Sequence, residues 1–230
     1  MIAILKNKYS SFLRLISSKK RRSDYLDSLV GPYGYWDQLQ QYQFNFLLAQ
    51  GLKKHHTLLD MGCGPLQGGL AFIDYLDPGS YTGIDMCHEP LTEAYRLIAE
   101  KKLVHKNPIL INSNTFGRKE LIDKKFDYIW ISQLFYHLDD QHIHKLFQQL
   151  TNYMKPNSII LGDIIGYPNN VKDDSHWRHF RFHVHSVEFL EKTAVQYDLL
   201  LAPIGTIKDF GYPEEINLHT NQMLKITKAQ

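Results

Sequence analysis

The stretch that decides the fold is residues 57–68, which read TLLDMGCGPLQG. Its first five residues form a short apolar run that is typical of a buried β-strand. Gly62 and Gly64 follow at once, and a second apolar run of helical length begins at Leu66. A strand, a glycine turn and a helix in this order place a ligand over the carboxyl end of the strand. The two glycines let backbone N–H groups come close to a bound carboxylate or phosphate.

Strands and helices alternate on both sides of this turn. We expect helices over residues 36–50, 66–76, 89–103, 139–153 and 186–197, and strands over 57–61, 81–85, 109–112, 126–132, 158–165, 199–207 and 221–227. This alternation predicts a doubly wound α/β fold, with a mostly parallel seven-stranded sheet and helices on both faces. The last two strands have no helix between them, so they can pair only as an antiparallel hairpin.

The composition indicates one globular domain with an appendage. The chain has 230 residues, of which 43% are apolar and 22% are charged. Its net charge of +2 is uneven, because residues 1–22 hold seven basic groups and no acid. The rest of the chain has 19 basic against 24 acidic groups, which argues against a nucleic-acid groove. The apolar runs are too short for a transmembrane helix, and two cysteines do not make a disulfide scaffold.

The N-terminal segment is expected to be a basic amphipathic unit over residues 1–30, ahead of a main domain over 31–230. Apolar residues recur at helical spacing through residues 2–16, and a basic cluster follows at 19–22. The pattern lacks the continuous apolar stretch of a secretory signal, so we expect a cytoplasmic protein. One interpretation is a helix, within residues 1–22, that lies on the anionic inner face of a membrane. The other is a basic helix that is frayed or packed on a partner.

The spacing around the glycine turn narrows the ligand class. A nucleoside-triphosphate loop needs a Lys-Ser/Thr pair that this loop lacks. A dinucleotide loop needs its third glycine one residue earlier than Gly68. Asp60, two residues before the first glycine, is typical of S-adenosylmethionine sites. Asp85 ends the second strand 21 residues after Gly64, where a carboxylate suits the two hydroxyls of a ribose.

These motifs resemble those of class I S-adenosylmethionine-dependent methyltransferases of the small-molecule type. The resemblance covers residues 31–165 and extends more loosely to 227, and it is clearest from Phe44 through the glycine turn. The sheet of that family has seven strands, of which the last is antiparallel, in agreement with the ending expected here. One departure is the turn at residues 154–158, which lacks the glycine that commonly follows its proline.

The resemblance also implies a set of cofactor-binding residues. These are Asp60, Gly62, Cys63, Gly64 and Gly68 in the loop at the methionine moiety, Asp85 and Met86 at the ribose and adenine, Asn114 and Thr115 at the adenine edge, and Ser132 and Gln133 on the sulfonium side.

Catalysis would centre on the segment after the fourth strand. Methyl transfer from a sulfonium is an in-line displacement, so the protein mainly aligns the nucleophile and excludes water. An oxygen nucleophile often needs a base as well, and His137 is the candidate. The alternative is that Tyr136 and His137 only cover the cofactor. The chain has no Asn/Asp-Pro-Pro-Tyr/Phe tetrapeptide at this place, which argues against amide or nucleobase nitrogen as the acceptor and favours O-methylation.

A second candidate region, residues 173–185, is dense in His, Arg and aromatic side chains. It suits a polar acceptor, anionic or sugar-like. The substrate candidates are Tyr136, His176, Trp177 and Arg178. No ligand spacing here is diagnostic of a metal, so none is expected.

The sequence thus predicts methyl transfer from S-adenosylmethionine to a small-molecule acceptor. Two alternatives stay open. One is a catalytically silent cofactor-binding module recruited through its leader, and the other is a nicotinamide-dependent oxidoreductase. The sequence gives no oligomeric state.

Overall fold

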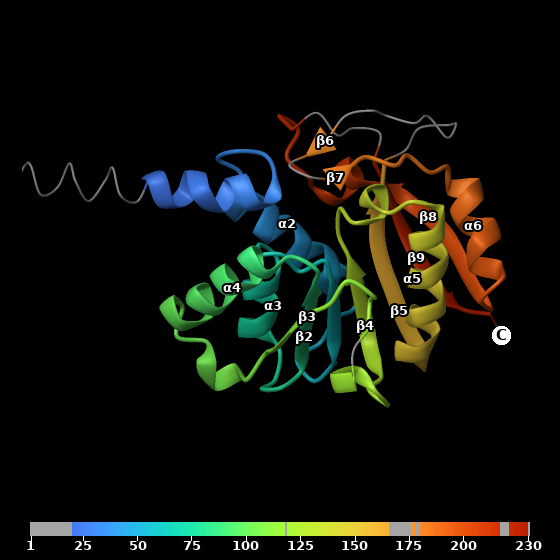
Figure 1. The fold of residues 1–230 in the computed structure, drawn as a ribbon, viewed down its shortest axis with the longest axis horizontal. Coiled ribbons are helices and arrows are strands. Elements are labelled where there is room, and N and C mark those ends of the chain that lie inside the picture. The colour runs from blue at the N-terminus through green and yellow to red at the C-terminus, as the bar shows by residue number, and fades with distance from the viewer. Residues whose placement is uncertain (1–19, 118, 166–175, 178–179, 217–220, 230) are drawn as a thin grey trace, which may run out of the picture.

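The computed structural model describes residues 20–117, 119–165, 176–177, 180–216 and 221–229. Its centre is a seven-stranded sheet with helices packed against it (Figure 1). The strands are β1 Leu58–Met61, β2 Tyr81–Asp85, β3 Ile109–Asn112, β4 Phe126–Ile131, β5 Met154–Ile164, β8 Leu199–Thr206 and β9 Gln222–Lys228. A separate two-stranded ribbon pairs β6 His176–Trp177 with β7 Phe180–Arg181.

The helices flank the strands in alternation, as the sequence predicts. After a first helix over residues 20–30, they are α2 Trp36–Ala49, α3 Gly69–Tyr75, α4 His88–Glu100, α5 Asp140–Tyr153 and α6 Val187–Val195. Short 3₁₀ turns lie at η1 Val104–Lys106, η2 Lys119–Leu121, η3 Phe135–His137 and η4 Ile207–Phe210.

The strand order is β3-β2-β1-β4-β5-β9-β8. Neighbours from β3 to β5 pair in parallel, whereas β9 is antiparallel to both β5 and β8. Six strands therefore run one way, and β9 runs the other way between two of them. The doubly wound, mostly parallel sheet with an antiparallel last strand is confirmed.

The core lies on both faces of the sheet because strand side chains alternate. Leu58 and Trp130 pack with α2, α3 and α4 on one face. Leu59 and Ile129 pack with α5 and α6 on the other. Two apolar layers thus hold the sheet rigid, and only its carboxyl edge is left to build a ligand site.

Three local expectations were wrong. Helix α3 begins at Gly69 rather than Leu66, because Leu66 has a φ of 69° and cannot continue a helix. Residues 155–157 do not form a turn before β5 but lie inside the strand. The strand is irregular there, because Ser158 Oγ accepts from Lys155 N at 2.6 Å and the pairing with β4 shifts register between Phe126 and Tyr128. On α2, the helical spacing of Leu39, Tyr42, Phe46 and Ala49 predicts one buried face, but Ala49 is exposed and Leu47 is buried instead.

Among the residues that the structure describes, no helix has the length and apolar character needed to cross a bilayer.

Candidate active site

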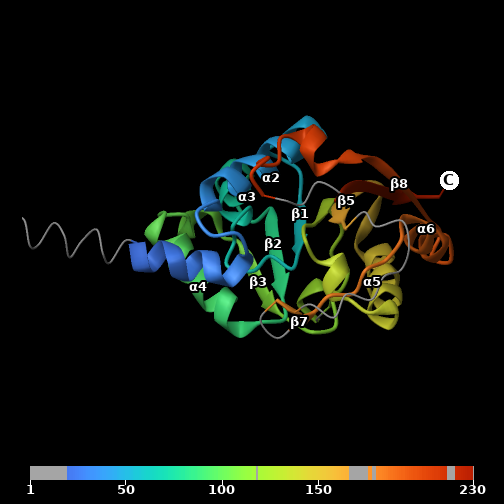
Figure 2. The ribbon, with the colours of Figure 1, turned by 90° about the horizontal axis from the view of Figure 1, so that it is seen from above.

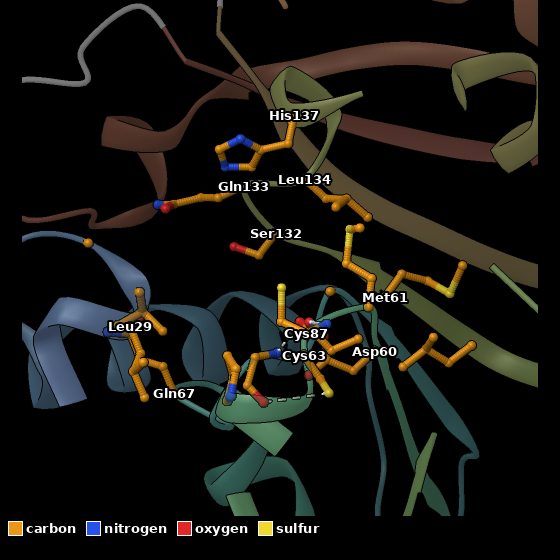
Figure 3. Close-up of a pocket in the computed structure, with 18 of the residues that line it drawn as sticks. Leu29, Asp60, Met61, Cys63, Gln67, Cys87, Ser132, Gln133, Leu134 and His137 are labelled. Carbon is orange, nitrogen blue, oxygen red and sulfur yellow. Dashed lines mark hydrogen bonds between the residues drawn. The ribbon is translucent and has the colours of Figure 1, made fainter. Parts of the chain in front are cut away.

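A cavity of about 780 Å³ opens over the carboxyl ends of β1, β2 and β4. Its size is typical of a pocket for a small ligand. The close-up shows Ser132 and His137 across the cavity from Leu29 and Gln67 (Figure 3). The register Met61↔Ile84 ends β1 and β2 at the same level, so the two loops that follow meet in the cavity.

The glycine loop is held to the end of β2 by backbone and side-chain hydrogen bonds. Gly62 N and Cys63 N both donate to Ile84 O, at 2.8 and 3.0 Å. Gly62 and Gly64 have φ values of 78° and 51°, which glycine adopts without steric cost. The Asp85 carboxylate accepts from Gly64 N at 2.9 Å and from Cys87 N at 2.8 Å. Asp85 therefore fixes the loop while it faces the cavity.

Asp60 is buried beneath the same loop. Tyr81 donates its hydroxyl to Asp60 Oδ2 at 2.6 Å, and the carboxylate lines the cavity from β1. Burial raises the pKa of Asp60 to about 7, against the opposing effect of the Tyr81 hydrogen bond. Burial also raises the pKa of Asp85, although the N–H groups of Cys87 and Gly64 counteract it. Both carboxyl groups lie where a cationic ligand group would favour their ionised forms.

The helix over residues 20–30 covers one side of the cavity. It lies along α4 (Figure 2), where Arg22 pairs with the buried Glu93 and Tyr25 donates to Glu89 at 3.2 Å. Leu29 and the residues to Tyr33 line the cavity. The site therefore draws on both sides of the expected boundary at residue 30.

The opposite wall follows β4. Gln133 has a φ of 51°, and its backbone N–H donates to Asp163 Oδ1 at 2.7 Å. Its side-chain Nε2 donates to Tyr212 at 3.2 Å. His137 lines the cavity beside Tyr136, and burial, aided by the nearby His183, lowers the pKa of His137 to about 4. The imidazole is therefore neutral at pH 7 but weakly basic.

A strap over residues 182–185 closes this wall. His183 N donates to Tyr136 O at 2.7 Å, and His185 Nε2 lies 2.7 Å from Leu138 O, so that nitrogen carries the proton. Phe182 lines the cavity and packs on Tyr136 with ring centroids 5.5 Å apart. The far end of the cavity thus presents the aromatic rings of Tyr136 and Phe182 beside the imidazole of His137.

The structure brings most of the sequence-predicted site residues to this one cavity. The predicted residues that line it are Asp60, Gly62, Cys63, Gly64, Gly68, Asp85, Met86, Asn114, Ser132, Gln133, Tyr136 and His137. Thr115 does not line it, because its hydroxyl turns away to Gly117 O at 2.9 Å, and Ser113 lies in the cavity instead. Cys63 and Cys87, both described, are thiols and not a disulfide.

The second candidate region falls largely outside the description. His176 and Trp177 are described only as the strand β6, and Arg178 lies outside the described residues. The described residues hold no group of three side chains that could bind a metal ion.

Sequence reasoning missed two parts of the lining. The residues from Leu29 to Tyr33 read as a leader and connector, and Gln43 and Gln67 carry no motif. Only the contact between segments far apart in sequence shows that they belong to the site.

The strand order and glycine loop define a doubly wound α/β protein with its ligand site at the carboxyl edge of the sheet. Residues 59–160 match the family model of a methyltransferase domain. No curated protein matches the chain. Residues 59–160 therefore resemble a methyltransferase domain, and the chain shares its fold with solved structures of S-adenosylmethionine-dependent methyltransferases.

Three solved structures illustrate the similarity. An S-adenosylmethionine-dependent methyltransferase from Clostridium acetobutylicum ATCC 824 is 15% identical, with a TM-score of 0.63 over 96% of this chain and 99% of that chain. The glycopeptide N-methyltransferase MtfA, complexed with S-adenosylmethionine, is 12% identical, with a TM-score of 0.63 over 82% of this chain and 94% of that chain. Magnesium protoporphyrin IX methyltransferase (ChlM) from Synechocystis PCC 6803, with bound S-adenosylmethionine, is 12% identical, with a TM-score of 0.62 over 84% and 79%. At these identities the likeness is one of fold.

Proposed function

We propose that the protein transfers the methyl group of S-adenosylmethionine to a hydroxyl of a small molecule. The observation that carries the proposal is one continuous cavity. It begins at the glycine loop held by Asp85 and continues past the end of β4 to His137 and Phe182. One end suits a nucleoside with an amino-acid tail, and the other suits an acceptor.

The residues at the loop fit the cofactor. Asp85 keeps unused lone pairs beside its two backbone partners, so it can also accept from the ribose hydroxyls. Asp60 places a carboxylate near the position expected for the ammonium group, and Met86 and Asn114 lie where the adenine is expected. The bound cofactor supplies an activated methyl group on a sulfonium.

The far end of the cavity would orient the acceptor and exclude water. Ser132 and Gln133 border the sulfonium side, and Asp163 holds the backbone of Gln133 in its left-handed conformation. Tyr136 and Phe182 provide apolar ring surfaces against which the acceptor can be aligned for in-line attack. His137 is the candidate to take up the proton of the acceptor hydroxyl. The alternative is that His137 only covers the bound cofactor.

A small acceptor is favoured over a nucleic acid because residues 23–230 have an excess of acidic groups. Two of the similar structures are named for methylation of a glycopeptide, at nitrogen, and of magnesium protoporphyrin IX, and neither acceptor is a nucleic acid. Oxygen is preferred here because the tetrapeptide for amide nitrogen is missing after β4.

We also propose that the protein is cytoplasmic and that residues 1–22 make a peripheral contact with an anionic membrane surface. The support is the charge of the segment, with seven basic groups and no acid.

Calorimetry with S-adenosylmethionine, S-adenosylhomocysteine and NADH tests the cofactor. We expect binding of the first two alone, and binding of NADH alone would favour the oxidoreductase alternative. Turnover with a cell extract as acceptor, followed by S-adenosylhomocysteine release, then separates the enzyme from a silent module. An enzyme releases S-adenosylhomocysteine only when the extract is added.

A further inference from the structure

Three side chains form a hydrogen-bonded chain from the core to the cavity. Trp130 Nε1 on β4 donates to Gln43 Oε1 on α2 at 3.0 Å. Gln43 Nε2 donates to Gln67 Oε1, at the end of the glycine loop, at 3.4 Å. Trp130 and Gln43 are buried, and both Gln43 and Gln67 line the cavity, in which Figure 3 labels Gln67. We call these three residues the amide relay.

The chemistry of the indole fixes the direction of the amide relay. An indole N–H can only donate, so Gln43 must present its oxygen to Trp130 and its NH₂ group to Gln67. Gln67 must then present its own oxygen to Gln43. This leaves Gln67 Nε2 as the terminal group, and that nitrogen is buried without a hydrogen-bond partner among the residues that the structure describes. A buried amide donor of this kind calls for an acceptor.

Gly68 makes room for the amide relay. Its φ of −79° and ψ of −36° are ordinary for any residue, so backbone strain does not require a glycine here. A Cβ at this position would instead lie 2.8 Å from Gln43 Cδ and would collide with Gln43 Oε1. A side chain at residue 68 would therefore push the Gln43 amide out of line.

We propose that Gln67 Nε2 donates to the carboxylate at the amino-acid end of the cofactor, an inference that rests on the proposed function. Asp60 and Asp85, the two carboxylates of the lining, would repel that group, so its burial requires a donor. Ribose hydroxyls, in contrast, donate to Asp85 and do not need an amide N–H. Gln67 thus makes the site selective for nucleosides that carry an amino-acid tail.

The test compares two ligands that differ in this tail. S-adenosylhomocysteine has the carboxylate, and 5′-methylthioadenosine lacks the amino-acid end. We expect Gln67→Leu to weaken S-adenosylhomocysteine binding roughly 10- to 100-fold in calorimetry and to leave methylthioadenosine binding unchanged. Gln67→Glu, which adds a negative charge, should weaken S-adenosylhomocysteine binding at least as much. Gln41→Leu, a change on the exposed side of α2, is the matched control and should alter neither affinity.

A second variant tests the amide relay behind Gln67. Gly68→Ala should cause the same selective loss, and it should add no further loss when combined with Gln67→Leu. Circular dichroism of each variant checks that the fold is kept.

The outcomes separate this inference from the proposed function. Equal losses for both ligands would place Gln67 at the nucleoside and overturn the inference. Unchanged affinity for S-adenosylhomocysteine in the folded Gln67→Leu variant would also overturn it, while the proposed function would stand. A wild type that binds neither ligand would overturn the proposed function and this inference together.

Discussion

Asp85 holds the glycine loop with the same carboxylate that we assign to the ribose. We predict that Asp85→Ala weakens S-adenosylmethionine binding by about 1.5–3 kcal/mol, because charge-assisted hydrogen bonds are lost. Loss of the bonds to Gly64 N and Cys87 N should add mobility in the loop. Calorimetry measures the change, and unchanged affinity in a folded variant would remove the ribose assignment. Asp85→Asn keeps the size of the side chain and one acceptor oxygen, so it should weaken S-adenosylmethionine binding less than Asp85→Ala does.

Asp60 makes stability depend on pH. Its pKa is near 4 in an unfolded chain and about 7 in the folded protein, so the folded state binds the proton more tightly. The stabilisation by the bound proton is complete below about pH 4 and is lost as the pH rises to about 7. The full effect is on the order of 4 kcal/mol, from about 1.4 kcal/mol for each pH unit.

We therefore predict that Asp60→Asn, which cannot ionise, changes the pH profile of unfolding. Between pH 5 and 8 the wild type should lose free energy of unfolding relative to the variant. Urea unfolding at several pH values measures this difference. Asp163, whose pKa burial raises to about 6, contributes equally to both proteins and cancels. Parallel profiles would show that Asp60 is ionised throughout.

His137 is a weak base, because burial lowers its pKa to about 4. If it is the base, His137→Ala should lower the rate about 100-fold or more while cofactor affinity holds. Activity requires the unprotonated imidazole, so the wild-type rate should fall with acid near pH 4, where the structure puts the pKa, and not near 6.5. His142→Ala, another histidine of the lining, is the control. If His137→Ala instead weakens cofactor binding and lowers the rate only modestly, His137 covers the cofactor and is not the base.

At the scale of elements, Arg22 connects the helix over residues 20–30 to α4, where it pairs with the buried Glu93 and the exposed Glu100. We predict that Arg22→Ala destabilises the protein by about 1–3 kcal/mol, because the Glu93 carboxylate stays buried with Arg96 at 3.5 Å as its other cation. Arg96 is 64% exposed, so Arg96→Ala should cost less than about 1 kcal/mol. Urea unfolding compares the two variants. Equal losses would show that Arg22 has no special part in holding the helix.

The elements near the glycine loop could be predicted because their signals are local. β2 and β3 begin and end at the predicted residues, since short apolar runs bounded by polar residues define them. The helical face of α2 was only partly predicted. Ala49 keeps the helical spacing, but the direction in which the neighbouring elements lie decides burial, and it favours Leu47.

The rest of the site could not be predicted from the sequence for the same physical reason. Gln43 and Trp130 are 87 residues apart, and their hydrogen bond exists only once α2 lies on the sheet. Leu29 enters the cavity through the packing of its helix on α4, to which the ion pair of Arg22 contributes. A glutamine or a leucine has no spacing rule that marks it as a ligand contact, whereas a glycine turn does.

For the molecule as a whole, the uneven charge predicts a response to lipid. Full-length protein should bind vesicles rich in anionic lipid at low salt, with each Lys or Arg near the surface contributing about 1 kcal/mol. Deletion of residues 1–19 removes four of the seven basic groups and keeps Arg22 for Glu93. Sedimentation with vesicles should show binding lost and calorimetry should show cofactor affinity kept. If the full-length protein does not bind such vesicles at low salt, the membrane proposal is wrong.

The position of β9 constrains how the protein is made. The strand enters between β5 and β8, yet it is the last of the three to leave the ribosome. Until it arrives, a nascent chain has β5 and β8 with open edges, which are prone to pair with other chains. The carboxyl half of the sheet therefore closes only after β9 has been synthesised, and until then its open strands are exposed to other chains and to the chaperones that shield such strands.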